Sequence, residues 1–351
     1  MKKILAMLLA LMMVLSLAAC GAKAPAEEPA PAPEADAPAA EAPAEEAGES
    51  YTIATVVKLT GVAWFDRMEI GVNDFAADHP EHDVFQTGPA TGDPAEQVRV
   101  IEDLIAQGVD ALCVVPSSTE SLEAVLGKAM EQGIKVVAHE AANIQNADVD
   151  VEAFVNTEYG NHFMEAIGAQ MGGKGQYTTF VGALTATSHN EWVDGSVAVQ
   201  EEKFPEMELI SNKNETTENE ETAYTKTKEL LTAYPELVGF QGSAMTDVPG
   251  VGRAIQEAGK QDSTVVIGTS LVSVAGKYLE DGSIDMISFW DPAMAGYAMN
   301  ELALILLEGG SIEDGMSLEA AGYQNLKLDG KVLYGSAWVD VTVDNMGDYD
   351  F

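Results

Sequence analysis

The sequence predicts an α/β protein with two doubly wound, Rossmann-like units of about equal size. From residue 51 onward, apolar runs rich in β-branched residues alternate with amphipathic stretches, and this alternation restarts after Thr157. Runs such as residues 111–115, Ala-Leu-Cys-Val-Val, are apolar on both faces. Such runs are typical of parallel strands that helices cover on both sides.

The first unit is expected to begin at residue 51. Its strands are predicted at 51–57, 83–87, 111–115 and 135–139, its helices at 64–78, 94–107 and 119–132, and a further extended piece at 153–157. Gly108 and Gly133 stand just past two of these helices, where glycine commonly ends a helix.

The second unit repeats the pattern. Its helices are predicted at 158–171, 190–204, 219–234, 248–259 and 272–281, its strands at 177–182, 208–211, 237–241, 264–268 and 285–290, and the last long helix at 292–307. Ligands of doubly wound sheets bind outside the carboxyl ends of the strands. The loops after the strands are therefore where a site is expected.

The residues before the body are interpreted as a signal and a linker. Lys2 and Lys3 precede an apolar run over 4–19, and the segment Leu-Ala-Ala-Cys at 17–20 resembles a lipobox. We expect residues 1–20 to form a lipoprotein signal peptide ending at Cys20, which takes a lipid anchor; the alternative is an ordinary cleaved signal with a chance cysteine. Residues 21–50, with six prolines and eight acidic residues, are expected to be a disordered stalk.

Charge and motifs exclude several function classes. The chain has 57 acidic against 18 basic residues, a formal charge of −39, which disfavours nucleic acid as a partner. Cys20 and Cys113 are the two cysteines, too few for a disulfide framework. No P-loop, nucleophile elbow or zinc motif occurs. We expect no enzyme, no cofactor and no metal site, although His139 and Glu140 at a strand end remain a weak candidate for general base catalysis.

The strand-end loops share polar groups next to large aromatic residues. A neutral sugar or polyol is bound by aromatic rings that stack on its C–H faces and by ionised groups that form hydrogen bonds to its hydroxyls. The candidate ligand-binding residues are Lys58, Trp64, Phe65, Glu140, Ser188, His189, Asn190, Trp192, Ser243, Met245, Asp247, Trp290 and Asp291. Structural roles remain possible for several of these residues. The aromatic residues could belong to the hydrophobic core, and Asp247, Ser188 and Asn190 could cap helices.

Several short segments carry a family resemblance. They are residues 57–62 (Val-Lys-Leu-Thr-Gly-Val), 190–192 (Asn-Glu-Trp), 289–291 (Phe-Trp-Asp) and 346–351 (Met-Gly-Asp-Tyr-Asp-Phe). In this order and spacing, residues 51–351 resemble a type I periplasmic (substrate-binding) protein of an ABC importer, in the autoinducer-2-binding and rhamnose-binding branch. The resemblance implies two lobes joined by a hinge, here 51–157 plus about 291–325 and 158–290 plus about 326–351.

The resemblance also implies roles for site residues. Lys58 matches the ligand-gripping lysine of the family, and Glu140 stands where an aspartate is usual. Residues 188–189, Ser-His, replace an Asp-Gln pair, while Ser243 and Met245 replace a proline and an alanine. These departures favour a pentose, a deoxyhexose or a related polyol over autoinducer-2.

The expected function is solute binding outside the cytoplasm, at the cell membrane. The two lobes, linked near 156–157 and 289–291, would close on the ligand and deliver it to an ABC permease, with the protein as a monomer. The alternatives are a sugar or autoinducer-2 sensor that signals to a membrane receptor and, more remotely, a sugar-acting enzyme. Lys58→Ala and Glu140→Ala are expected to lose affinity with little change in melting temperature.

Overall fold

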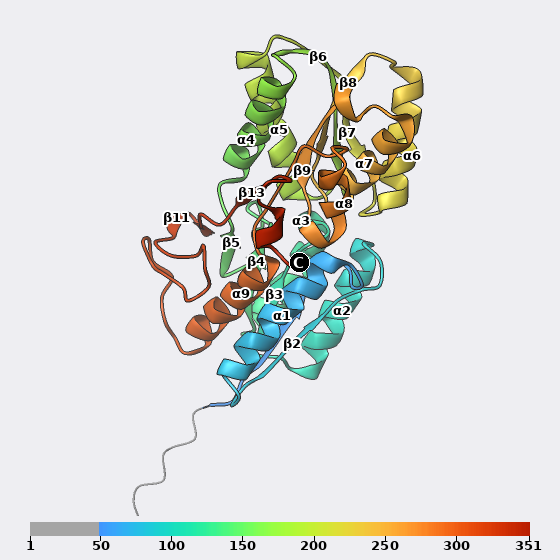
Figure 1. Ribbon diagram of the computed structural model, residues 1–351. Helices are drawn as coiled ribbons and strands as arrows, with labels where there is room; N and C mark the ends of the chain where they lie inside the picture. Colours follow the sequence, from blue (N-terminus) through green and yellow to red (C-terminus); the bar gives the residue numbers. More distant parts are fainter. Residues whose placement is uncertain (1–48) are drawn as a thin grey trace, which may run out of the picture. The chain divides into compact units, whose positions relative to one another are not determined.

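The computed structural model describes residues 49–351, which belong to one compact unit (Figure 1). The predicted signal peptide, Cys20 and all but the end of the predicted linker lie outside the described residues. Within residues 49–351, none of the helices has the length and apolar character needed to span a bilayer.

The first sheet has the strand order β11-β12-β5-β4-β3-β1-β2 and is parallel except for β11, which runs antiparallel to β12. Its strands are β1 (Thr52–Val56), β2 (Asp83–Thr87), β3 (Ala111–Val114), β4 (Lys135–His139), β5 (Val149–Glu152), β11 (Lys327–Asp329) and β12 (Val332–Tyr334). The helices that accompany it are α1 (Ala63–Asp78), α2 (Pro94–Gln107), α3 (Thr119–Glu131) and α9 (Pro292–Leu307).

Strand β1 shows why this sheet is covered on both faces. Ile53 and Val57 point into the core shared with α1, whereas Ala54 and Val56 point into the core shared with α2 and α3. Successive side chains of a strand alternate between the two faces, so an apolar run needs helices on both. Helix α2 starts where the Asp93 side chain accepts a hydrogen bond from the Ala95 N–H, and ends at Gly108 with a φ of 79°.

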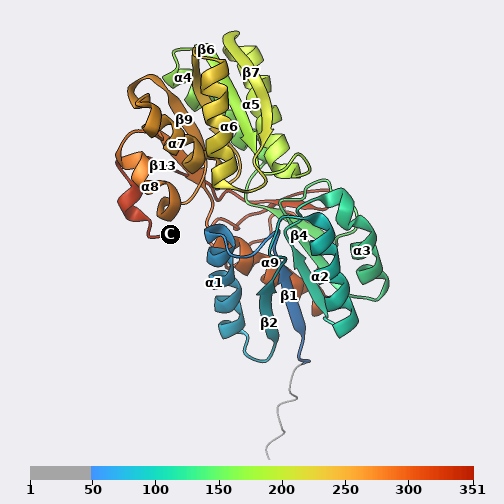
Figure 2. The same ribbon diagram turned by 90° about the vertical axis from the view of Figure 1, so that its right-hand side faces the viewer.

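The second sheet has the order β13-β10-β9-β8-β6-β7, with only β13 antiparallel to its neighbour. Figure 2 shows this sheet and its helices in the upper part of the view and the first sheet in the lower part. Its strands are β6 (Lys174–Val181), β7 (Glu206–Glu215), β8 (Leu237–Gly242), β9 (Val265–Thr269), β10 (Met286–Phe289) and β13 (Val339–Val341). Its helices are α4 (Asn156–Gln170), α5 (Thr187–Lys203), α6 (Glu220–Ala233), α7 (Asp247–Ala258) and α8 (Val272–Glu280), with 3-10 turns η1 (Gln261–Ser263) and η2 (Met346–Asp348). The predicted α/β class with two sheets is confirmed.

The chain passes between the two sheets three times, at residues 153–155, 290–291 and 335–338. Each crossing contributes an aromatic side chain to one cluster. The Phe154 ring lies 5.2 Å from that of Trp290 and 5.3 Å from that of Trp338, both in edge-to-face geometry. The three connections are thus packed together at their centre, where any relative motion of the two lobes must pivot.

Two features of the sheets differ from the sequence-based expectation. The fifth strand is β5 at Val149–Glu152 rather than the predicted extended piece at 153–157. It was not predicted because charged residues normally stay exposed, whereas Asp150 and Glu152 are buried. Strands β11 and β12 join the first sheet, whereas residues 326–351 were assigned to the second lobe. Lys331 anchors this hairpin, since its ammonium donates to the carbonyl oxygen of Ala147 at 2.9 Å.

Candidate functional site

A cavity lies between the carboxyl ends of the two sheets, as the fold class predicts. Both lobes contribute to its wall, which consists of Lys58, Val62, Trp64, Phe65, Glu140, His189, Trp192, Glu218, Ser243, Met245, Thr246, Thr269 and Trp290. The cavity volume is about 30 Å³, enough for a water molecule. A larger ligand therefore requires the lobes or the lining side chains to move apart.

An ion pair lies in the first-lobe wall of the cavity. Lys58 follows β1 and Glu140 follows β4, and the Lys58 Nζ lies 2.6 Å from Glu140 Oε2, with the two residues only 4% and 5% exposed. Burial works against both charges, yet the Lys58 ammonium lowers the pKa of Glu140 to about 2 and the nearby carboxylates raise the pKa of Lys58. Removing either partner leaves a buried charge. With the pair buried in this way, we expect alanine variants to lose stability as well as affinity.

Glu140 also joins the two lobes. Its Oε2 accepts a hydrogen bond of 3.1 Å from the Ser188 hydroxyl, in the first turn of α5. Glu140 has a φ of 57°, a left-handed conformation that is unfavourable for a residue with a side chain. Such strain persists where the surroundings hold the residue in place, and it often marks a functional position.

Three of the four tryptophans line the cavity. The Trp290 ring lies 4.7 Å from Trp64 and 5.8 Å from Trp192, with interplanar angles of 74° and 79°. Two of the three indole N–H groups are already engaged, since Trp192 donates to Asn156 Oδ1 at 2.7 Å and Trp290 donates to His139 Nε2 at 3.2 Å. These two rings therefore offer the cavity carbon edges and faces rather than hydrogen-bond donors.

His139 does not face the cavity. Its Nε2 accepts from Trp290, and its Nδ1 lies in hydrogen-bond contact with the Val151 carbonyl, so the ring proton is on Nδ1. Burial lowers the pKa of His139 and keeps it neutral. His139 is thus occupied in holding Trp290 and is not positioned as the general base that the sequence left open. Among the described residues, no group of three metal-ligating side chains has the geometry to hold a metal ion.

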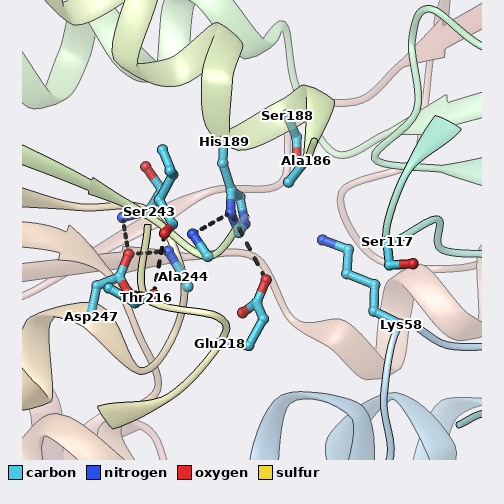
Figure 3. A network of polar contacts seen from close by, with 12 residues as sticks. Lys58, Ser117, Ala186, Ser188, His189, Thr216, Glu218, Ser243, Ala244 and Asp247 are labelled. Carbon is cyan, nitrogen blue, oxygen red and sulfur yellow. Dashed lines mark hydrogen bonds and ion pairs between the residues drawn. The ribbon is translucent and has the colours of Figure 1, made fainter. Parts of the chain in front are cut away.

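His189 is the neutral polar group of the second-lobe wall. Its Nδ1 accepts the Gly182 N–H at 3.2 Å, which places its proton on Nε2 (Figure 3). Burial and the nearby Lys58 ammonium lower the pKa of His189 to about 3. The side chain is therefore an uncharged donor at neutral pH.

Two hydroxyls of the second-lobe wall have no partner among the described residues. They are Ser243 Oγ and Thr246 Oγ1, both on the loop between β8 and α7 and both removed from solvent. Buried polar groups without hydrogen bonds cost free energy, so nearly all of them are satisfied in folded proteins. A ligand with hydroxyl groups would satisfy both.

Sequence reasoning missed Glu218 in this wall. Glu218 lies on the loop between β7 and α6, and both Thr217 and Glu218 have left-handed φ angles, 55° and 53°. Its carboxylate covers Gly182, where a Cβ would lie 2.2 Å from Glu218 Oε1. Burial raises the pKa of Glu218. No motif marked it, because a glutamate in this acidic, polar loop resembles any solvated surface residue. Thr246, Thr269 and Val62 were also missed.

Of the predicted residues, nine line the cavity: Lys58, Trp64, Phe65, Glu140, His189, Trp192, Ser243, Met245 and Trp290. Ser188 reaches it only through Glu140. Asn190 lies outside the wall, and its amide donates to the Leu184 and Ala186 carbonyls at 3.1 and 2.6 Å.

Asp247 and Asp291 have structural roles instead of lining the cavity. Asp247 accepts the Ser243 and Ala244 N–H groups and the Thr216 hydroxyl, at 3.0, 2.8 and 2.7 Å (Figure 3). Asp291 starts α9 by accepting the Ala293 N–H, and it forms a two-point ion pair with Arg67 at 2.9 and 2.7 Å. Both carboxylates are engaged within the protein. Asp291 caps α9, whereas the alternative that Asp247 caps a helix is wrong, because its carboxylate binds N–H groups of the turn before α7.

Comparisons with known proteins agree with this fold. The chain is 28% identical over 207 residues to the xylitol-binding protein of Mycolicibacterium smegmatis, covering 55% of this chain and 53% of that one. It thus spans about half the length of that relative. It is 25% identical over 254 residues to the D-allose-binding periplasmic protein of Escherichia coli, covering 69% of this chain and 80% of that one.

Solved structures show the same architecture. A solute binding protein of an ABC transporter from Clostridium phytofermentas, with bound L-rhamnose, has a TM-score of 0.78 at 21% identity and covers 86% of this chain and 98% of its own. LsrB from Clostridium saccharobutylicum, in complex with AI-2, has the same TM-score and sequence identity, and the match covers 86% of this chain and 100% of that one. The family model described as the periplasmic binding protein domain matches residues 53–311, and the chain therefore belongs to the periplasmic binding protein domain family.

Proposed function

We propose that this chain is an extracytoplasmic solute-binding lipoprotein of an ABC transporter that binds a monosaccharide or a sugar-like polyol between its lobes. The observation that carries the proposal is the cavity itself, in which three indole rings face polar groups from both lobes. Aromatic rings pack against the C–H faces of a sugar, while carboxylates and hydroxyls bind its hydroxyl groups. The named ligands of the relatives, xylitol and D-allose, belong to the same chemical class.

The charges of the wall support a ligand without negative charge. Lys58 is the one positively charged side chain among the described residues of the wall, and Glu140 already neutralises it at 2.6 Å. His189 stays uncharged because its pKa is about 3. A carboxylate or phosphate group on the ligand would therefore meet Glu218 and Glu140 without a free cation to pair with.

Binding is proposed to proceed by hinge closure. The cavity volume of about 30 Å³ is too small for a sugar ring, so the ligand must enter a more open form. Contacts that bridge the lobes, such as Ser188 to Glu140 at 3.1 Å and Thr185 to the Ser117 carbonyl at 3.1 Å, then form on closing. The aromatic cluster of Phe154, Trp290 and Trp338 is the proposed pivot, and Trp290 connects it to the cavity wall. The closed form would be the one presented to the permease.

The lipobox-like segment at 17–20 supports membrane attachment through Cys20. A lipid anchor keeps the binding protein near its permease, and the proline-rich acidic residues that follow would hold it off the surface. Metabolic labelling with a fatty acid, comparing the full chain with Cys20→Ala, tests this part of the proposal: label in the wild type only is the expected result.

The test of ligand binding is a thermal-shift screen of residues 49–351 against pentoses, hexoses, deoxyhexoses, polyols and autoinducer-2. A ligand that binds the native state raises the melting temperature by mass action. We expect a concentration-dependent rise with at least one sugar or polyol and recovery of that compound unchanged. Absence of any shift across the panel would reject the proposal, and a chemically altered compound would show an enzyme instead.

A further inference from the structure

We propose that the ligand of this cavity carries a protonated amino group in addition to its hydroxyls, and that the Glu218 carboxylate binds that group. This inference rests on the proposed function, because it concerns the same cavity and narrows the class of ligand from sugars and polyols to amino sugars or amino polyols.

The first argument is the balance of charged groups in the wall. Two carboxyl groups, Glu140 and Glu218, face one ammonium, that of Lys58. Lys58 Nζ is committed to Glu140 at 2.6 Å, and His189 supplies no charge because it is neutral. The wall is therefore one positive charge short of neutrality when Glu218 is ionised. A cationic ligand supplies that charge.

The second argument is the unpaired state of Glu218. Its nearest basic atom is His189 Nδ1 at 4.0 Å, which is beyond hydrogen-bond distance and already accepts the Gly182 N–H. No hydrogen bond from another described residue reaches the carboxylate, and its side chain is only 18% exposed. Asp247, the first residue of α7, shows the contrast, since it accepts three hydrogen bonds from this lobe. Glu218 is thus an acceptor that the protein places in the cavity and leaves free.

The third argument is the strain that keeps Glu218 in place. Thr217 and Glu218 are consecutive residues with side chains and left-handed φ angles of 55° and 53°. Each such residue costs free energy and persists where the structure fixes it, often at ligand sites. The backbone therefore turns Glu218 into the cavity at a cost to stability. A purely solvated glutamate would not require this conformation.

The aromatic walls provide the complementary surface. The rings of Trp64 and Trp192 stand at 74° and 79° to that of Trp290, and all three line the cavity. Indole faces attract cations, and such aromatic enclosures are used for ammonium groups. Burial raises the pKa of Glu218, so a neutral ligand leaves the carboxyl group tending to protonate, whereas a bound ammonium keeps it ionised and paired.

The test compares matched sugars by calorimetry on residues 49–351 at pH 6.5. The pairs are D-glucosamine with D-glucose, D-galactosamine with D-galactose and D-mannosamine with D-mannose, and the N-acetyl derivatives serve as uncharged analogues. At least one amino sugar is expected to bind about tenfold or more tightly than its parent, as a charged hydrogen bond contributes. Glu218→Gln, which keeps shape and removes charge, should reduce that preference below about twofold.

Glu229→Gln is the matched control, because Glu229 is exposed on α6 and does not line the cavity. It should leave the preference unchanged. If the neutral sugars bind as tightly as the amino sugars, or if Glu218→Gln leaves the preference intact, the inference is overturned while the proposed sugar site stands. If no member of these pairs binds while another sugar or polyol gives a thermal shift, the inference is overturned and the proposed function stands. If no compound of either panel binds, the proposed function fails together with the inference.

Discussion

The two walls of the cavity differ in how completely their polar groups are paired. In the first lobe, Lys58 and Glu140 satisfy each other at 2.6 Å, and the Trp290 N–H is bound to His139. In the second lobe, the hydroxyls of Ser243 and Thr246 have no partner among the described residues. The first wall is therefore organised before the ligand arrives, while the second is completed by it. Preorganisation of one wall lowers the entropic cost of binding.

The largest expected effect comes from breaking the ion pair of the first wall. Glu140→Ala leaves the Lys58 ammonium buried and unpaired, which should destabilise the fold by about 3–5 kcal/mol and abolish sugar binding. Urea unfolding and calorimetry measure the two effects.

The double variant Lys58→Met with Glu140→Gln separates these effects. Replacing both charges by uncharged side chains of similar size restores most of the stability, but it should not restore affinity. If Glu140→Ala unfolds like the wild type, the first wall is not held together by this pair.

A pH titration sharpens the comparison for the second wall. The pKa of His189 is lowered to about 3 in the folded state, mainly by burial, against about 6.5 in the unfolded chain. Between these values the unfolded state binds more protons, so the contribution of His189 to stability is complete above pH 6.5 and is lost as the pH falls.

The variant His189→Gln isolates this contribution. As the pH falls from 6.5 to 5, the free energy of unfolding should fall less steeply in this variant than in the wild type. The two slopes should differ by about 1.4 kcal/mol per pH unit. Asp247 acts in the opposite direction in this range, because burial raises its pKa to about 7, so only the difference between the two proteins is informative. Parallel pH profiles would show that His189 is not buried in its neutral form.

Ser243→Ala removes a hydroxyl that the folded protein leaves unpaired. We expect the melting temperature to stay unchanged or to rise slightly, because no hydrogen bond within the protein is lost. Affinity for the sugar should fall about tenfold, a loss of about 1.4 kcal/mol. A loss of stability with unchanged affinity would contradict this account, because it would show that the Ser243 hydroxyl binds within the protein and not to the ligand.

The smallest effect is expected for Asn190→Ala. The Asn190 amide donates to the carbonyl groups of Leu184 and Ala186, in the loop before α5, and Asn190 does not line the cavity. Affinity should change by less than about twofold, as for surface substitutions within about 0.5 kcal/mol. A loss comparable to that of Ser243→Ala would place Asn190 in the site, as its position in the sequence first suggested.

The sequence predicted the fold class and the first wall more fully than the second. Parallel strands end at one edge of a sheet, so the positions of Lys58 and Glu140 after apolar strands sufficed to bring them together. Strand β5 was not predicted, because its alternation of valine with Asp150 and Glu152 resembles a solvated segment, although both carboxyl groups are buried. Periodicity does not reveal that a charge is buried.

The second wall depends on loop conformation, which local sequence patterns do not specify. Asp247 was a candidate because it follows a strand, but the turn after β8 directs its carboxylate back to the Ser243 and Ala244 N–H groups. Glu218 was passed over because only the left-handed backbone at 217–218 turns it into the cavity. Both outcomes follow from backbone angles rather than from residue type.

The most direct measurement is a crystal structure of residues 49–351 with the sugar that gives the largest thermal shift. The account predicts the sugar ring between the lobes, with its carbon face on Trp64, Trp192 or Trp290 and its hydroxyls within hydrogen-bond distance of Glu140 and Ser243. A sugar bound on the outside of either lobe, with the cavity between the sheets unchanged, would contradict it.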